Sequence, residues 1–410
     1  MSGPLAGVRV LDLSRVLAAP WCTQHLGDLG ADVVKVERPG QGDDSRKWGP
    51  PWLRDAQGRD TTESAYYLSA NRNKRSIAID FAAPQGRALV RELAAQADVL
   101  VENYKVGDLA RHGLGFAQLQ ALNPRLVYCS VTGFGQDGPC ATRPGYDILF
   151  QGLGGIMSVT GEPDDKPGGG PQRVGVPVVD LFTGMYAAIA IVSALHHVTR
   201  GGEGQHIDVS LFDSVMALGS GALSNYFVGG RPTQRTGNAS PNIAPYEVFA
   251  CADGQLVLAT GSQGHFELLC QVIGRPELPL DPRFRDNAGR LANRDALHRL
   301  LGEVFATASG AAWEEKLLRH GVPCGPINDH AQALAHPNAQ HRGTRIELPH
   351  RHGVPAPGVA SPMRCSATPV SYRLPPPTLG QHSREILQEW LAYDAPRIGE
   401  LEQAGVLVCG

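Results

Sequence analysis

The sequence predicts an α/β protein with a large, doubly wound, Rossmann-like domain and a smaller α+β domain. The main observation is that apolar strand-like runs alternate with helical patterns in the N-terminal half. A length of 410 residues also fits two domains better than one. Finally, Gly, Asn, Ser and Pro accumulate at 220–245, which indicates a change of domain there.

The first three elements form a βαβ unit. Residues 8–13 make an apolar strand, 20–29 have helical spacing, and 32–37 make a second strand. The pattern continues with expected strands at 76–80, 99–102, 126–132 and 203–209 and a helix at 84–97. In such a sheet, ligands bind at the carboxyl ends of the strands. The first strand-to-helix turn, 14–20, lacks G-x-G-x-x-G, which disfavours a dinucleotide site.

The middle of the chain has a different pattern. Residues 248–260 are typical of a hairpin that turns at Asp253-Gly254, and helices are expected near 264–274, 293–308 and 311–320. A segment rich in Pro and His follows at 335–377, and two short amphipathic helices are expected within 380–405. This middle part is therefore expected to form the smaller domain.

Composition excludes several classes of function. A net charge of −3 gives no reason to expect nucleic acid or an anionic membrane as a partner. The chain contains no H-E-x-x-H, C-x-x-C or Asp-rich loop, so no metal site is expected. It also contains no G-x-S-x-G motif, so a hydrolase triad is not expected. The apolar stretch between Asp180 and His196 is too short to favour a membrane span. Without a signal-peptide pattern, and with eight cysteines in no paired motif, we expect a cytoplasmic protein.

Asp180 is the main candidate for chemistry. It lies where an extended apolar run meets the helix expected at 185–195. Such a carboxylate is shielded from water and close to the positive end of a helix, so we expect it to be ionised and open to a substrate. The alternative is structural, because an Asp before a helix is most often only its N-cap.

Basic residues border the predicted sheet. Arg38 follows the second strand, Arg72 and Lys74 precede the third, and Arg111 and Arg143 lie beyond later strands. Together they favour a ligand with several phosphates, although each alone is typical of a solvated charge.

Two glycine-containing loops flank the candidate carboxylate in the sequence. Residues 133–139, together with Gly145-Tyr146-Asp147, are expected to wall a pocket near Asp180. Residues 161–170 are equally consistent with a mobile flap and with a solvent-exposed loop.

Nine segments taken together resemble the class III CoA-transferases, the family of formyl-CoA transferase and the carnitine CoA-transferases. They are GVRVLDLS at 7–14, GDLGADVVKVERP at 27–39, NRNKRS at 71–76, DVLVENY at 98–104, GYD at 145–147, GVPVVDLFTG at 175–184, GQHIDVS at 204–210, GVPCGPI at 321–327 and LGQH at 379–382. The resemblance covers essentially the whole chain. Residues 42–51, 66–74 and 393–406 most resemble the dicarboxylate branch, which includes succinate–hydroxymethylglutarate CoA-transferase.

The resemblance implies an interlocked, ring-like homodimer. Each large domain would be built from 1–220 and from 336–410, with a linker and the small domain at 221–335. The Pro-rich stretch would be the linker that returns to the large domain.

The resemblance also implies a reaction. Asp180 would attack the donor thioester to form a mixed anhydride, and CoA thiolate would then convert the anhydride into an aspartyl-CoA thioester. The acceptor acid would reverse both steps. Acyl-CoA is then a substrate, and neither a metal nor a prosthetic group is required. Succinyl-CoA is the expected donor, and a C4 to C6 dicarboxylate the expected acceptor.

Ligand contacts are implied position by position. The resemblance assigns CoA contacts to Val16, Ala18, Arg38, Lys74, Asn103, Tyr104 and Arg111, with Arg72 and Arg143 as further candidates. Arg46 is expected to bind the distal carboxylate of a dicarboxylate, and Tyr146 to face the substrate. The chain has Leu17 where formyl-CoA transferase has Gln, and no tetraglycine loop is evident, so formate and oxalate are not the expected substrates.

Two alternatives remain. An α-methylacyl-CoA racemase shares this fold, but its catalytic His is replaced here by Tyr146, and a phenol with an ordinary pKa near 10 is a poor base. A non-catalytic CoA-binding protein is the other alternative, although the chain retains Asp180 and its motif.

Overall fold

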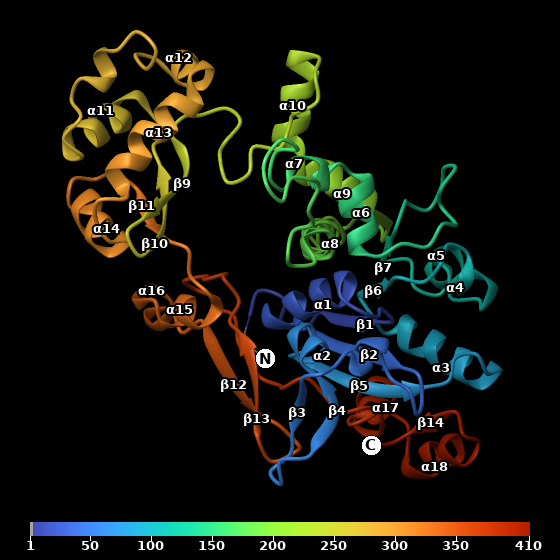
Figure 1. Cartoon of the computed structure of the whole chain (residues 1–410). Helices are drawn as coiled ribbons and strands as arrows, with labels where there is room; N and C mark the ends of the chain where they lie inside the picture. Colours follow the sequence, from blue (N-terminus) through green and yellow to red (C-terminus); the bar gives the residue numbers. More distant parts are fainter. Residues whose placement is uncertain (1–2) are drawn as a thin grey trace. The chain divides into compact units, whose positions relative to one another are not determined.

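The computed structural model describes residues 3–410, which form two compact units. The large unit contains the chain up to Gly154, Gly175–Gly219 and Pro337–Gly410, so both ends of the chain build it (Figure 1). The small unit contains Gly155–Val174 and Ser220–His336. The chain thus changes unit after Gly219 and after His336, and residues 155–174 also belong to the small unit.

A seven-stranded sheet forms the centre of the large unit. Its order is β14-β5-β2-β1-β6-β7-β8, and every pair is parallel except β14 with β5. The strands are β1 (Arg9–Asp12), β2 (Asp32–Glu37), β5 (Lys74–Ile79), β6 (Val99–Glu102), β7 (Val127–Thr132), β8 (His206–Ser210) and β14 (Leu407–Val408). The predicted α/β class with a parallel central sheet is therefore confirmed. The strand order reverses between β1 and β6, and such a switch point opens a crevice for ligands.

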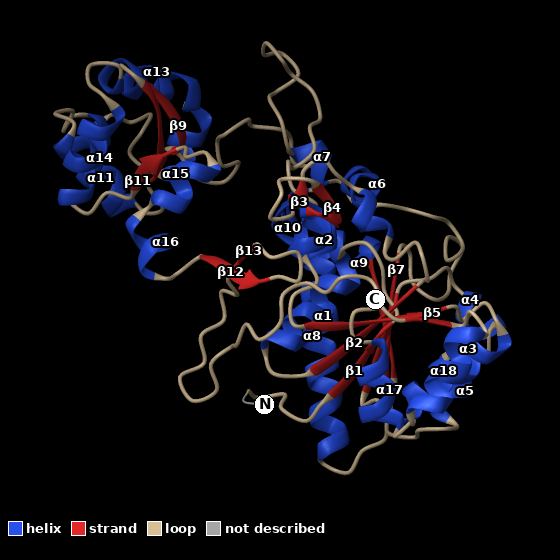
Figure 2. Ribbon diagram, turned by 90° about the horizontal axis from the view of Figure 1, so that it is seen from below, coloured by secondary structure: helices blue, strands red, loops and turns tan. Residues whose placement is uncertain are grey.

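Helices cover both faces of this sheet, as Figure 2 shows. On one face lie α1 (Ala18–Asp28) and α8 (Val178–Thr199), and on the other α3 (Pro84–Ala95), α5 (Phe116–Gln120), α17 (Ser383–Leu391) and α18 (Ala395–Gln403). Strand side chains alternate between the faces, so Leu11 and Leu13 join the core formed with α3 and α17.

Helix α8 is longer than the sequence predicted. It begins at Val178 and continues through the two histidines to Thr199, which makes it the one helix within 3–410 long and apolar enough to cross a membrane. The helix is longer than the apolar stretch between Asp180 and His196 on which the sequence prediction was based, so its length alone does not argue against a span. Its packing is that of a core helix, because it lies against α1, β7 and β8. Gly184 permits the close approach, since a Cβ there would come within 2.4 Å of the Ala18 carbonyl oxygen.

Smaller elements complete the large unit. They are η1 (Asp44–Lys47), β3 (Trp52–Arg54), β4 (Asp60–Ser64), α2 (Ala65–Ser69), α4 (Asp108–Arg111), α6 (Asp147–Leu153), α9 (Leu211–Leu218), α16 (Pro337–His341), β12 (Arg345–Pro349) and β13 (Pro355–Val359). The return segment that contains β12 and β13 is fastened to the large unit by side chains that donate to its carbonyl groups. Arg72, for example, donates to the Val359 carbonyl at 2.9 Å.

The small unit has its own core. An antiparallel sheet of β9 (Tyr246–Cys251), β10 (Gly254–Ala259) and β11 (Cys324–Pro326) contains the predicted hairpin. Phe249, Phe266 and Phe305 pack in that core. Its helices are α7 (Ile156–Val159), α10 (Ser220–Gly229), α11 (Gln263–Val272), η2 (Leu278–Leu280), α12 (Asn287–Ala292), α13 (Arg294–Phe305), α14 (Gly310–Arg319) and α15 (His330–Ala335).

The loop predicted as either a flap or a solvent loop, 161–170, is held within the small unit. Arg235 donates to the Ser158 and Glu162 carbonyls at 3.1 Å each and pairs with Asp164.

Candidate active site

A pocket of about 270 Å³ lies in the large unit at the carboxyl ends of β1, β6 and β7. This position is the switch point of the sheet, where the fold predicts a ligand. The pocket brings together several residues predicted from the sequence, namely Val16, Ala18, Asn103, Tyr104, Arg143, Tyr146 and Asp180.

A second cavity of about 290 Å³ adjoins the pocket. Arg38 lines it, as predicted for a ligand contact, and Arg15, Asp44 and Tyr104 line both spaces. The Arg15 guanidinium lies 4.5 Å from the centre of the Tyr104 ring, in a cation–π arrangement at this junction. The two cavities therefore form neighbouring compartments with arginine side chains at their walls.

Asp180 is buried in the first turn of α8, and it is not the N-cap. Pro177 occupies the cap position, so the structural alternative for Asp180 was wrong. The capping acceptor comes instead from the neighbouring helix α6. Asp147 Oδ2 accepts the backbone N–H groups of Val179 at 2.8 Å and of Asp180 at 3.2 Å. These bonds leave the Asp180 side chain free to face the pocket.

The electrostatics of Asp180 differ from the prediction. Burial raises the pKa of its carboxyl, and the nearby charge of Asp147 raises it further, to about 7. The sequence interpretation expected Asp180 to be shielded from water and kept ionised by the helix end. It did not account for the effect of burial on the pKa, nor for the charge of Asp147. At neutral pH the carboxyl is thus close to its midpoint, where it is a stronger base and nucleophile than an ordinary carboxylate.

The sequence interpretation assigned no role to Arg15, Trp48 and Tyr66, and it expected Asp147 only to help wall the pocket near Asp180. Burial, followed by the charges of Asp180 and Asp147, raises the pKa of Tyr66, so its hydroxyl stays protonated at neutral pH. The Trp48 and Tyr66 rings meet edge to face with centroids 5.0 Å apart. Arg15 lies between the two cavities. The sequence offered one signal for two of these residues: Arg15 follows the first strand and Asp147 begins a helix, and polar residues at such positions often face a ligand site.

Lys74 and Arg72 do not line either cavity. Lys74 is fully buried, and its ammonium donates to Asp12 at 3.1 Å as well as to the Pro20 carbonyl and the Asn71 side chain. Arg72 binds both carboxylate oxygens of Asp28, at 2.9 and 2.6 Å. Both cations are paired with buried carboxylates and line neither cavity. The structure therefore does not support the predicted contacts of Lys74 and Arg72 with CoA.

Arg46 is corrected for the same reason. Its buried guanidinium binds Glu37 through two nitrogens, at 2.8 and 2.7 Å, and binds Glu63 at 3.0 Å. It also donates to the Tyr67 hydroxyl and the Pro377 carbonyl. With its donors occupied in this way, Arg46 is not available to a substrate carboxylate.

Arg111 lies outside both cavities. Its side chain is exposed at the end of α4 and pairs there with Asp108. Within residues 3–410, no group of three or more His, Cys, Asp or Glu side chains is arranged to hold a metal ion.

The model for CoA-transferase family III matches residues 5–383. The chain therefore belongs to this family and is a class III CoA-transferase. It is 46% identical over 391 residues to succinate–glutarate CoA-transferase of Agrobacterium fabrum (strain C58 / ATCC 33970), which covers 94% of this chain and 95% of the relative. It is 43% identical over 408 residues to succinyl-CoA:glutarate CoA-transferase of Homo sapiens, covering 98% of this chain and 90% of the relative.

A solved structure gives the same answer for the fold. The crystal structure of a CAIB/BAIF family protein from Brucella suis superposes with a TM-score of 0.83 at 45% sequence identity. The match covers 95% of this chain and 100% of that one.

Proposed function

We propose that this enzyme transfers CoA from succinyl-CoA to a dicarboxylate of the glutarate type, with Asp180 as the covalent carrier. The observation that carries the proposal is the buried carboxyl of Asp180 in the wall of the switch-point pocket, with a pKa of about 7. The names of the A. fabrum and human relatives supply the two acids.

The first half-reaction loads CoA onto the enzyme. The ionised Asp180 carboxylate attacks the thioester carbonyl, a C–O bond forms, the C–S bond breaks, and CoA leaves as a thiolate. The thiolate then attacks the Asp180 carbonyl carbon of the mixed anhydride. Succinate leaves, and CoA remains on Asp180 as a thioester.

The second half-reaction transfers CoA to the acceptor. The acceptor carboxylate attacks the aspartyl thioester and releases the thiolate, which then attacks the acyl carbon of the acceptor. Acyl-CoA leaves, and the Asp180 carboxylate is regenerated. The aspartyl thioester must be kept from water, and burial of Asp180, which is only 9% exposed, supports this requirement.

The neighbouring cavities fit the two ends of an acyl-CoA. We place the thioester between Tyr146 and Asp180 in the first cavity, and the phosphates toward Arg15 and Arg38 at the second. The Arg15 side chain is 43% exposed and lies 3.5 Å from the exposed carboxylate of Asp44, so a phosphate can replace that carboxylate as its partner. Arg143, Asn103 and the backbone of Val16 and Ala18 complete the proposed contacts.

We also propose the homodimer that the resemblance implies. The large unit exposes large apolar side chains on two helices, which a second copy would cover: Ile148, Leu149 and Leu153 on α6, and Tyr186, Ile189 and Val192 on α8. Light scattering should give about twice the chain mass of 43.7 kDa. A monomer at micromolar concentration would contradict this part of the proposal.

We place the enzyme in the cytoplasm, where thiols stay reduced. All eight cysteines are free in the structure, which supports a reducing compartment. Fractionation of the source cells should recover the protein with cytoplasmic markers.

The proposed reaction is tested by product formation. Wild-type enzyme with succinyl-CoA and glutarate should form glutaryl-CoA, and Asp180→Asn should form none. Hydroxylamine should trap the wild-type thioester as a hydroxamate at Asp180, located by peptide mass spectrometry. A panel of mono- and dicarboxylic acids then defines the acceptor.

Three outcomes would contradict the proposal. Activity confined to monocarboxylates would refute the dicarboxylate assignment, and full activity of Asp180→Asn would refute the nucleophile. Solvent deuterium entering the α carbon of a chiral acyl-CoA at the rate of turnover would indicate a racemase instead.

A further inference from the structure

The turn at Val16 has a strained backbone at the edge of the pocket. Val16 has φ of 72°, in the left-handed region, which costs an L-residue roughly 1–2 kcal/mol and is an outlier for a β-branched side chain. Val16, Leu17 and Ala18 all line the pocket. A strained conformation persists only where surrounding groups impose it, so the groups that hold this turn matter to the ligand.

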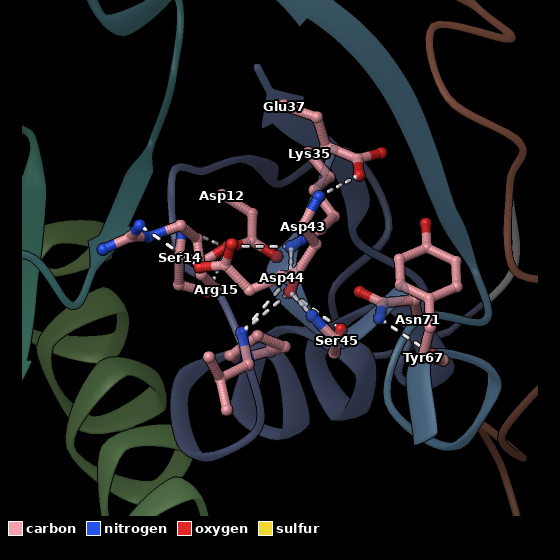
Figure 3. A network of polar contacts seen from close by, with 12 residues as sticks. Asp12, Ser14, Arg15, Lys35, Glu37, Asp43, Asp44, Ser45, Tyr67 and Asn71 are labelled. Atoms are coloured by element: carbon pink, nitrogen blue, oxygen red, sulfur yellow. Dashed lines mark hydrogen bonds and ion pairs between the residues drawn. The ribbon is translucent and has the colours of Figure 1, made fainter. Parts of the chain in front are cut away.

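A buried carboxylate from another loop holds the turn. Asp43, which is 1% exposed, accepts the Val16 N–H with Oδ1 at 3.1 Å and Oδ2 at 3.3 Å. Lys35, which projects from β2, lies 2.8 Å from Asp43 Oδ2 and also donates to the Ser14 carbonyl at 2.7 Å. Figure 3 shows the Lys35 ammonium and the Asp43 carboxylate pointing at one another beside Ser14 and Arg15.

The far side of the turn is fixed as well. Asn103 accepts the Arg15 N–H at 2.9 Å and donates to the Arg15 carbonyl at 2.6 Å. Ser45 donates both its backbone N–H and its hydroxyl to Asp43 Oδ1, at 2.9 and 2.7 Å. Lys35 and Ser45 thus fix the position of the Asp43 carboxylate, and the hydrogen bonds that this carboxylate accepts restrict the backbone at Val16.

The carboxylate remains an acceptor at working pH. Burial alone would raise its pKa, but the Lys35 charge and the hydrogen bonds lower the pKa of Asp43 to about 2. Charge-assisted hydrogen bonds to a backbone N–H are stronger than neutral ones, so this contact can offset the strain at Val16.

We propose that Asp43, fixed by Lys35, is a positioning residue of the acyl-CoA site: it holds Val16 in the left-handed conformation and so shapes the wall formed by 15–18. This role rests on the proposed function, in which that wall contacts CoA. Without Asp43, Val16 relaxes to a negative φ, and residues 15–18 no longer hold the conformation that lines the pocket. A glycine at position 16 adopts positive φ without such support.

The test is a double-mutant cycle on succinyl-CoA binding, measured by calorimetry. Asp43→Ala should raise Kd about 5- to 30-fold, which corresponds to the cost of the left-handed conformation. In a Val16→Gly background the same Asp43→Ala change should raise Kd less than about threefold. The exposed carboxylate of Asp60, replaced by Ala, is the matched control and should leave Kd unchanged.

Folding is checked separately. Thermal unfolding is followed for every variant, and Asp43→Asn, which retains one acceptor oxygen, replaces Asp43→Ala if the latter does not fold. An equal loss of affinity in the wild-type and Val16→Gly backgrounds would refute the positioning role, as would unchanged binding by Asp43→Ala. Failure of the wild-type enzyme to bind succinyl-CoA would instead refute the proposed function and this role with it.

Discussion

The replacement Asp147→Asn should shift the pH dependence of turnover, because Asp147 acts on Asp180 in two separable ways. Its carboxylate accepts the Val179 and Asp180 N–H groups, and its charge raises the pKa of Asp180. Asn is as good a cap as Asp but carries no charge, so the replacement keeps the acceptor for the helix start. It removes the electrostatic effect together with one acceptor, the Oδ1 that binds Gln151.

The expected size follows from the pKa. With a pKa of about 7, Asp180 in the free enzyme is only about one-tenth ionised at pH 6, so wild-type kcat/KM there should be about tenfold below its alkaline plateau. Removing the Asp147 charge lowers the pKa of Asp180, and the ionised fraction at pH 6 rises. The variant should therefore lose less of its kcat/KM on acidification than the wild type.

The assay is kcat/KM for succinyl-CoA at a fixed glutarate concentration from about pH 5.5 to about pH 8.5, each variant normalised to its own plateau. Asp147→Ala is the companion variant, since it also removes the cap and should cost about 1 kcal/mol of stability that Asp147→Asn retains. If the acidic fall of activity in Asp147→Asn stays at the wild-type pH or moves to higher pH, the proposed effect of the Asp147 charge on the pKa of Asp180 is refuted.

The remaining predictions concern stability. Asp180 has a pKa of about 7 in the folded protein against 3.8 for an ordinary Asp side chain. Between these pH values the unfolded state loses the proton first, so wild-type stability falls as pH rises. Urea unfolding should show Asp180→Asn more stable than wild type at pH 8, by up to about 4 kcal/mol, and similar near pH 4. Gly184→Ala should lose about 1–3 kcal/mol, because its Cβ would collide with the Ala18 carbonyl; unchanged stability would mean that the helices can separate. Arg46→Met should lose about 3–5 kcal/mol by leaving Glu37 unpaired, without changing acceptor preference among folded molecules; altered preference would return Arg46 to the substrate site.

The sheet was predictable because its signal is local. Runs such as 8–13 and 32–37 are apolar over several residues, and their alternation with helices predicts parallel pairing wherever the strands lie in the sequence. The position of Asp180 at a helix start was predictable for the same reason. Its pKa was not, since one of its causes, Asp147, lies on a different helix.

The basic residues show the limit most clearly. Charges that border strands predict a polar sheet edge, but the sequence does not reveal which of them meet buried acids. Arg38 lines a cavity, whereas Lys74 is paired with Asp12, which is 62 residues away in the chain. Arg72 is neutralised by Asp28 in the same way. The acidic residues Asp12, Asp28 and Glu37 in β1, α1 and β2 indicate that some of these cations form internal ion pairs.

The short strand β14 covers one edge of the central sheet and is the last of its seven strands in the sequence. Leu407 and Val408 pair with the outer edge of β5, which is made early, while its partner lies far along the chain. Until β14 is made, β5 presents unpaired backbone groups beside the apolar Ile77 and Ile79, and such an edge can recruit other nascent chains. Yield from cells, more than catalysis, should therefore suffer when the end of the chain is trimmed.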